Sequence, residues 1–186
     1  GESMRKFFAQ RLEELGPKLG PLVWQFANTK KFEPEDFEAF LRLLPRDHAG
    51  QKLRYAVEVR HPSFVTPELP ALCAKYSVAI CHADHAAYPE IGDVTADFVY
   101  SRLQKGNDDI ATAYDDQDLQ RWRSIAKGWA EGLEPDGLVY ADPVANAPVQ
   151  PRDVFVYFIH EGKVRAPQGA MACQGMVDAD AGASGA

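Results

Sequence analysis

The sequence has little of what marks a membrane protein, a secreted disulfide framework or a zinc module. No run approaches the roughly 18 apolar residues of a membrane span, and residues 1–6 lack the apolar core of a signal peptide. Its three cysteines form no Cys-x-x-Cys pair and no Cys-His ligand spacing. We therefore expect a cytoplasmic protein with reduced cysteines and no membrane partner.

The sequence also lacks an excess of positive charge. Its 27 acidic side chains outnumber 20 Lys and Arg, which gives a formal net charge of -7. Because surfaces that bind nucleic acid are usually basic, a nucleic acid partner is not favoured, although a local basic patch stays open. A small-molecule ligand is the expected partner, and the oligomeric state is left open.

Several catalytic signatures are absent as well. There is no Gly-rich phosphate loop, no Gly-x-Ser-x-Gly elbow and no His-Glu-x-x-His motif. The sequence therefore indicates no particular cofactor and no familiar catalytic nucleophile.

What is present is an alternation of strand-like and helix-like segments. Short apolar runs predict strands over 22–26, 54–61, 78–84, 97–103 and 153–160. Amphipathic spacing predicts helices over 4–19, 34–44, 66–76 and 115–131, with another after Pro167. Such alternation indicates a parallel sheet in a single α/β domain over 1–177. Residues 133–151 are expected to be loosely held, and the low-complexity segment 178–186 to be a disordered tail.

Five parallel strands suit two architectures. One is an open five-stranded parallel sheet, and the other is the later portion of a (βα)8 TIM-barrel-like fold. A complete (βα)8 barrel takes roughly 200 residues or more. Under the barrel hypothesis, this chain is therefore an incomplete barrel of about five strands.

Polar side chains recur toward the carboxyl ends of the predicted strands. Since residues two apart in a strand share a face, Glu58 lies with Arg60, His82 with Asp84, and Tyr100 with Arg102. The first strand adds Gln25, and the last adds Tyr157 on one face or His160 on the other. Because binding sites of parallel α/β folds lie at this end of the strands, we expect these residues to share one site.

A metal site is the weaker interpretation of the same residues. His82 and Asp84 are two apart, and Glu58 could supply a further oxygen ligand. Because His-x-Asp is common by chance, we predict no metal site.

Five blocks of the sequence carry a resemblance to a known family. They are Leu19-Gly-Pro-Leu-Val-Trp-Gln-Phe26, Phe32-x-Pro-x-x-Phe-x-x-Phe-Leu-x-Leu-Leu-Pro45, Tyr55-Ala-Val-Glu-Val-Arg-His-Pro-Ser-Phe64, Thr95-Ala-Asp-Phe-Val-Tyr-x-Arg-Leu103 and Val154-Phe-Val-Tyr-Phe158. Over about residues 15–171 the chain resembles the YecE-like family, also called domain of unknown function family 72. The resemblance implies a (βα)8-type barrel of which this chain is the carboxy-terminal two-thirds, beginning after the first three strands. It implies no established reaction.

The resemblance also points to particular residues. The family's Glu-x-Arg-His-x-Ser block falls on Glu58, Arg60, His61 and Ser63, its Tyr-x-Arg block on Tyr100 and Arg102, and its Ala-Asp pair on Ala83 and Asp84. This chain departs from the family pattern at Phe64, at Gln104-Lys105 and at Ile159-His160. These departures affect the outer wall of the expected pocket more than its floor.

Three functions fit these residues. The first is an enzyme on an anionic or polyhydroxylated small molecule, by phosphoester or glycoside hydrolysis or by isomerisation. Its catalytic candidates are Glu58 and Asp84 as general bases and His61 and His82 as proton shuttles; its binding candidates are Arg60, Arg102, Tyr100, Gln25, Ser63 and Tyr157. The second is a module that binds a nucleotide or nucleic acid end without chemistry. The third is a structural polar plug, in which Glu58 and Arg60 pair with Arg102 and Asp84 only to satisfy one another.

Overall fold

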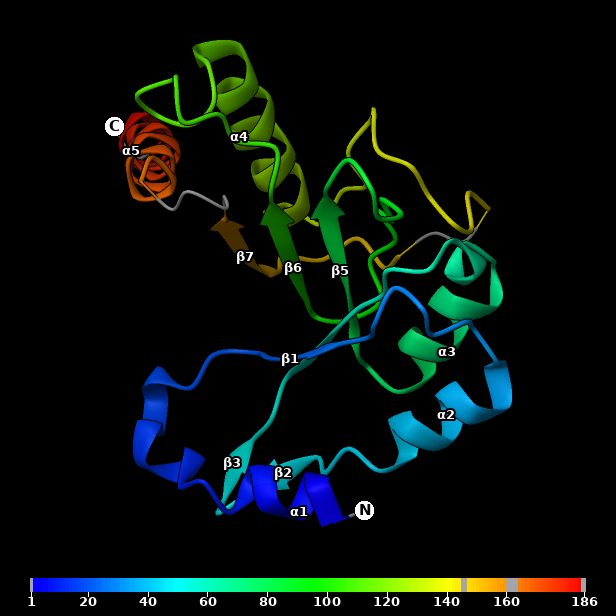
Figure 1. Ribbon diagram of the computed structural model, residues 1–186. Helices are drawn as coiled ribbons and strands as arrows, with labels where there is room; N and C mark the ends of the chain where they lie inside the picture. The colour runs from blue at the N-terminus through cyan, green and yellow to red at the C-terminus, as the bar shows by residue number, and fades with distance from the viewer. Residues whose placement is uncertain (1, 145–146, 160–163, 185–186) are drawn as a thin grey trace.

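A five-stranded parallel sheet forms the centre of the protein (Figure 1). The computed structural model describes residues 2–144, 147–159 and 164–184. The strands are β1 (Leu22–Gln25), β4 (Tyr55–Glu58), β5 (Ala79–Asp84), β6 (Phe98–Leu103) and β7 (Asp153–Phe158). All five predicted strands are confirmed, with ends up to three residues shorter, and the α/β class with them. His160 lies outside the described residues.

The helices pack against one face of this sheet. They are α1 (Glu2–Phe8), η1 (Leu12–Lys18), α2 (Pro34–Arg42), η2 (Pro62–Phe64), α3 (Glu68–Lys75), α4 (Asp116–Ala130) and α5 (Ala166–Ser184). A small antiparallel pair, β2 (Asp47–His48) with β3 (Gln51–Lys52), was not predicted. No helix in the described part of the chain is long and apolar enough to cross a bilayer.

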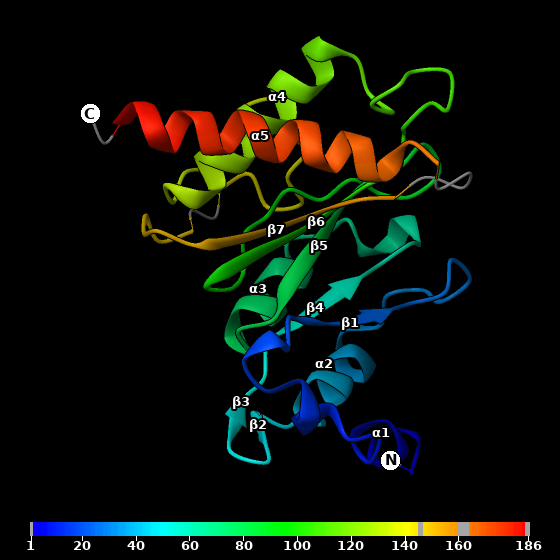
Figure 2. The same cartoon turned by 90° about the vertical axis from the view of Figure 1, so that its left-hand side faces the viewer.

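The strand order is the same in space as in sequence. The sheet runs β1-β4-β5-β6-β7, and every neighbouring pair is parallel. Figure 2 shows β1 and β4 next to α1 and α2 at one end, and β6 and β7 next to α4 and α5 at the other. A doubly wound sheet would reverse its order at a switch point. This order without a reversal is the winding of a barrel, and between the described strands the sheet is not closed.

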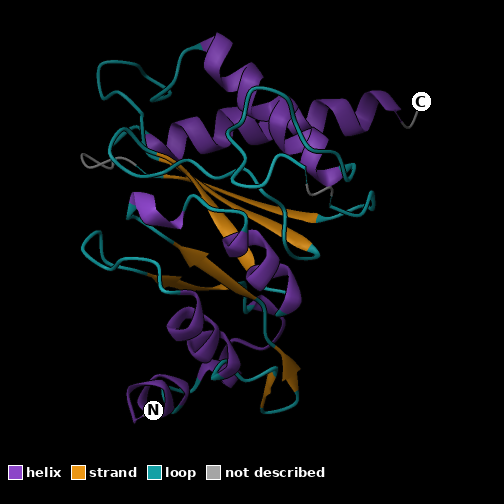
Figure 3. Cartoon of the chain, turned by 90° about the vertical axis from the view of Figure 1, so that its right-hand side faces the viewer, coloured by secondary structure: helices purple, strands orange, loops and turns teal. Residues whose placement is uncertain are grey.

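Strand alternation gives the sheet two unlike faces. On one face, the odd-numbered residues of β4 pack on α2 and α3, and the odd-numbered residues of β6 and the even-numbered residues of β7 join α4 and α5 through residues such as Val154 and Leu119. The other face carries a cluster of strand and loop residues with no helical member, namely Val23, Ala56, Ala79, Cys81, Ala96, Phe98, Tyr100 and Phe155. We call this the concave face; Figure 3 shows the helices gathered above and below the strands.

Two local predictions are wrong. The single helix expected over 4–19 is two helices, because Arg11 adopts a left-handed φ of 62° and Gly16 has φ 51° and ψ -132° inside the second. The tail expected from residue 178 continues α5 as far as Ser184. Its alanines favour helix, and Asp180 accepts a 2.8 Å hydrogen bond from Arg123 Nε on α4.

The loop before β7 is held by close backbone contacts. Asp93 accepts hydrogen bonds from the backbone N–H groups of Ala141 and Asp142 at 2.6 and 3.0 Å. Gly132 has a φ of +87°, and a Cβ on it would lie 2.4 Å from the Gln150 backbone nitrogen. These contacts do not fit the prediction that residues 133–151 are loosely held.

The substitution Gly132→Ala should therefore lower the free energy of unfolding by about 3 kcal/mol, through the backbone clash and the left-handed φ together. Gly137→Ala is the matched control, because its φ is +77° with nothing within 4 Å of the added Cβ. It should cost about 1 kcal/mol. Urea denaturation measures both, and equal losses would show that the close approach to Gln150 does not form.

Candidate functional site

A buried carboxylate lies at the carboxyl end of β4, on the concave face. Glu58 is 0% exposed, and its Oε1 accepts a 2.7 Å hydrogen bond from Arg60 Nε while its Oε2 accepts one from Arg102 Nη1. Gln25 Oε1 accepts from Arg60 Nη2 at 2.5 Å and from Arg102 Nη1 at 3.3 Å. We name Gln25, Glu58, Arg60 and Arg102 the arginine rim. The sequence predicted that these residues share a site, and the structure brings them together.

The backbone explains how three strands meet at one carboxylate. β1 and β4 are in register with Gln25 opposite Glu58. β5 lies between β4 and β6, and its residue beside Arg102 is Ala83. Because a methyl group occupies little of the concave face, the long Arg102 side chain reaches across β5 to Glu58.

The arginine rim has unused hydrogen-bond donors and a surplus charge. Among the described residues, Arg60 Nη1 and the Nε and Nη2 atoms of Arg102 have no hydrogen-bond partner. Both arginine side chains are 19% exposed. Two guanidinium groups and one carboxylate leave a formal net charge of about +1. The rim therefore presents N–H donors and positive charge to the open side of the sheet.

Aromatic rings flank the two arginines. The Arg60 guanidinium lies 4.5 Å from the centroid of the Tyr88 ring. His85 stacks on the same Tyr88 ring, with 4.0 Å between the ring centroids. Beside Arg102, Tyr157 is its partner in the β6–β7 register and stacks on Tyr100 at 4.8 Å. Burial raises the pKa of Tyr100.

His61 and Ser63 build a turn next to the rim. His61 Nδ1 accepts a 3.1 Å hydrogen bond from Ser63 N and lies 2.8 Å from Ser63 Oγ. Ser63 Oγ also accepts a 2.8 Å hydrogen bond from the backbone N–H of Phe32. The ring therefore caps η2, and the hydroxyl anchors the loop after β1.

His82 and Asp84 lie on the opposite face of the sheet. His82 is 2% exposed, and its ring centroid is 5.6 Å from Trp122 and 5.5 Å from Trp129 of α4. Asp84 Oδ1 lies 2.6 Å from Lys105 Nζ. The predicted pairing of Asp84 with the arginine rim is wrong, because the even-numbered residues of β5 face the helices while those of β4 and β6 at the rim face the concave side.

His82 is instead part of a buried polar chain. Its Nδ1 is 3.1 Å from Ser101 Oγ, and its Nε2 is 3.2 Å from Glu90 Oε1 in the loop after β5. The hydrogen bond with His82 lowers the pKa of Glu90. No group of three possible metal ligands occurs in the part of the chain that the structure describes.

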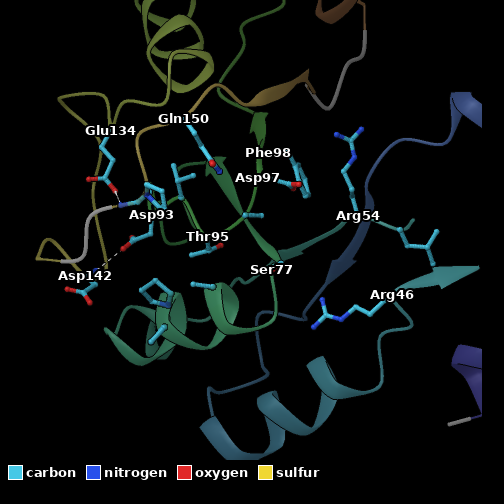
Figure 4. Close-up of a pocket in the computed structure, with 18 of the residues that line it drawn as sticks. Arg46, Arg54, Ser77, Asp93, Thr95, Asp97, Phe98, Glu134, Asp142 and Gln150 are labelled. Carbon is cyan, nitrogen blue, oxygen red and sulfur yellow. Dashed lines mark hydrogen bonds between the residues drawn. The ribbon is translucent and has the colours of Figure 1, made fainter. Parts of the chain in front are cut away.

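Two hollows lie away from the rim. A cavity of about 560 Å³ sits at the amino ends of β4 to β6, with Asp93, Glu134 and Asp142 on one side and Arg46 and Arg54 on the other (Figure 4). A groove of about 960 Å³ follows α4, β7 and α5. Binding sites of parallel α/β folds lie at the opposite end of the strands from the first hollow. The ionic groups of that hollow are engaged by the fold, as in the Arg54–Asp153 ion pair of 2.6 Å. We therefore take the rim as the candidate site.

The sequence did not single out Tyr88, whose ring lies against Arg60. Tyr88 lies in the loop after the carboxyl end of β5, the region that supplies binding residues in parallel folds. Its position in this short loop with Pro89 was the available signal.

The fold and the rim define a parallel α/β protein of the barrel type with an ionic cluster at its strand ends. A family model described as "Protein of unknown function DUF72" matches residues 1–184, so the chain belongs to this family. The match is longer than the likeness expected over about 15–171. No curated protein matches the chain.

Solved structures of the family share the fold. A DUF72 family protein from Thermotoga maritima superposes with a TM-score of 0.69 at 17% identity, over 95% of this chain and 65% of that one. One from Enterococcus faecalis gives a TM-score of 0.64 at 16% identity, over 96% and 70%. The chain thus spans about two thirds of the length of these structures, and identities this low show the fold alone.

Removing the charge of Glu58 should destabilise the fold. Glu58→Gln leaves two guanidinium groups without their carboxylate, so the free energy of unfolding should fall by about 3 kcal/mol. Glu131→Gln is the matched control, because Glu131 is half exposed and 3.9 Å from Lys127. It should change stability by less than about 0.5 kcal/mol. Losses of the same size in both variants would contradict the ionic cluster.

Glu90 should make stability depend on pH. Its pKa is lowered in the folded protein, so its contribution is present above about pH 4.5 and is lost as the pH falls through the folded-state pKa. Glu90→Gln should therefore be less stable than the unmodified protein at pH 7, with the difference shrinking toward pH 3. Chemical denaturation across this range measures it, and a pH-independent difference would refute the Glu90–His82 contact.

Proposed function

We propose that the arginine rim binds the phosphate or carboxylate group of a small molecule. The observation that carries the proposal is the pair of guanidinium groups that Glu58 and Gln25 hold side by side with donors still free. Guanidinium groups recognise phosphate and carboxylate through paired N–H donors. Because the two side chains are already oriented, less side-chain entropy is lost when an anion binds.

Glu58 is a positioning residue in this proposal. A general base must reach the proton that it removes, whereas both oxygens of Glu58 accept hydrogen bonds from arginine and its side chain is fully buried. His61 is committed to its turn, and His82 and Asp84 point to the helix side. These contacts favour ligand recognition over hydrolysis or isomerisation by the residues expected from the sequence.

A nucleic acid end is the weaker candidate ligand. The formal net charge of the protein is -7, and the rim supplies a surplus of only about one positive charge. A compact anion needs no wider basic surface. The cytoplasmic location expected from the sequence stays a prediction.

Each of the two arginines should contribute to phosphate binding. Arg102→Ala and Arg60→Ala should each weaken the affinity for inorganic phosphate at low ionic strength by about tenfold or more, since a hydrogen bond to a charged group contributes about 1.5–3 kcal/mol. Arg5→Ala on α1 removes the same charge from an exposed position and should leave the affinity unchanged. Isothermal titration calorimetry measures these constants.

Two results would overturn the proposal. One is the absence of phosphate and carboxylate binding by the unmodified protein at low salt. The other is an equal loss in Arg5→Ala and Arg102→Ala, which would reveal a general charge effect in place of a site.

A further inference from the structure

The hydrogen-bonding groups of the arginine rim are nearly all donors. Glu58 Oε1 and Oε2 both accept from guanidinium groups, and Gln25 Oε1 accepts from two of them. The free atoms, Arg60 Nη1 and Arg102 Nε and Nη2, can only donate. A ligand that fits must therefore be rich in acceptors and poor in donors.

This excess of donors over acceptors distinguishes anionic from polyhydroxylated small molecules, two ligand classes that the sequence alone did not separate. A polyhydroxylated molecule brings several O–H donors. At the rim, the Glu58 oxygens are buried and paired with guanidinium groups, and Gln25 Oε1 already accepts two hydrogen bonds. Donors that lose water without gaining a partner weaken binding. The rim is therefore matched to an anion whose organic part carries few hydroxyl groups.

A ring surface lies beside the rim. Tyr157 is 40% exposed although it belongs to β7, and it is the register partner of Arg102. Its ring is held by Tyr100, with a centroid distance of 4.8 Å and an interplanar angle of 26°. An exposed ring held in place next to a cation offers a flat apolar surface at low entropic cost.

We infer that the ligand of the rim is an aromatic anion, an aryl phosphate or aryl carboxylate, whose ring packs on Tyr157 while its anionic group binds Arg60 and Arg102. This inference rests on the proposed function and adds the class of the organic part. Tyr88, whose ring stacks on His85 and lies 4.5 Å from the Arg60 guanidinium, borders the site on the other side.

Three probes with the same anionic group test the inference by calorimetry. They are inorganic phosphate, phenyl phosphate and glucose 6-phosphate. Phenyl phosphate should bind roughly 2- to 12-fold more tightly than inorganic phosphate, the range expected for one aromatic pair. Glucose 6-phosphate should bind no more tightly than inorganic phosphate.

Two variants locate the ring. Tyr157→Leu should abolish the preference, so that phenyl phosphate and inorganic phosphate bind this variant with the same affinity. Tyr157→Phe keeps the ring and should keep the preference. Circular dichroism before each titration checks that both variants are folded, as expected for a partly exposed side chain.

The outcomes separate this inference from the proposed function. Equal affinities for phosphate and phenyl phosphate, a preference that survives Tyr157→Leu, or tighter binding of glucose 6-phosphate would each overturn the aromatic ligand, while phosphate binding that depends on Arg102 would still stand. If none of the three probes binds and benzoate, the matching aryl carboxylate, does not bind either, both the inference and the proposed function are overturned.

Discussion

The constraint on which the site depends is the burial of one carboxylate. A buried charge needs an opposite charge and hydrogen bonds to offset its lost hydration. Glu58 obtains both from Arg60, two residues along its own strand segment, and from Arg102, two strands away. The same contacts hold β1, β4 and β6 in a fixed relation at their carboxyl ends. Anion recognition is then a consequence of how the fold satisfies Glu58, because two guanidinium groups are left facing the open side.

Side-chain size decides which face can carry this cluster. The concave face at β5 is lined by Ala79, Cys81 and Ala83, so the strand between Glu58 and Arg102 leaves room for long side chains. The bulkier His82 and Asp84 are turned to the helix side, where Trp122, Trp129 and Lys105 surround them. Two polar clusters therefore exist on opposite faces, joined through the loop that carries both Tyr88 and Glu90.

The sequence predicted the strands, their parallel arrangement and the meeting of Gln25, Glu58, Arg60 and Arg102, because a period of two and apolar runs depend only on local order. It could not tell which face of β5 meets which face of β4, since that depends on register across the sheet. The contacts of His85 and Tyr88 depend on a loop path that no periodicity reports. The helix over 178–184 depends on the distant Arg123, and the break near Gly16 on backbone geometry.

An anion located directly would test the central claim, that Glu58 holds Arg60 and Arg102 as an anion-binding pair. Crystals soaked in tungstate, whose tungsten scatters anomalously, allow its position to be found without a ligand model. We expect an anomalous peak within hydrogen-bonding reach of Arg60 Nη1 and Arg102 Nη2, and loss of this peak in Glu58→Gln. A peak only between Arg46 and Arg54, at the opposite end of the strands, would contradict it.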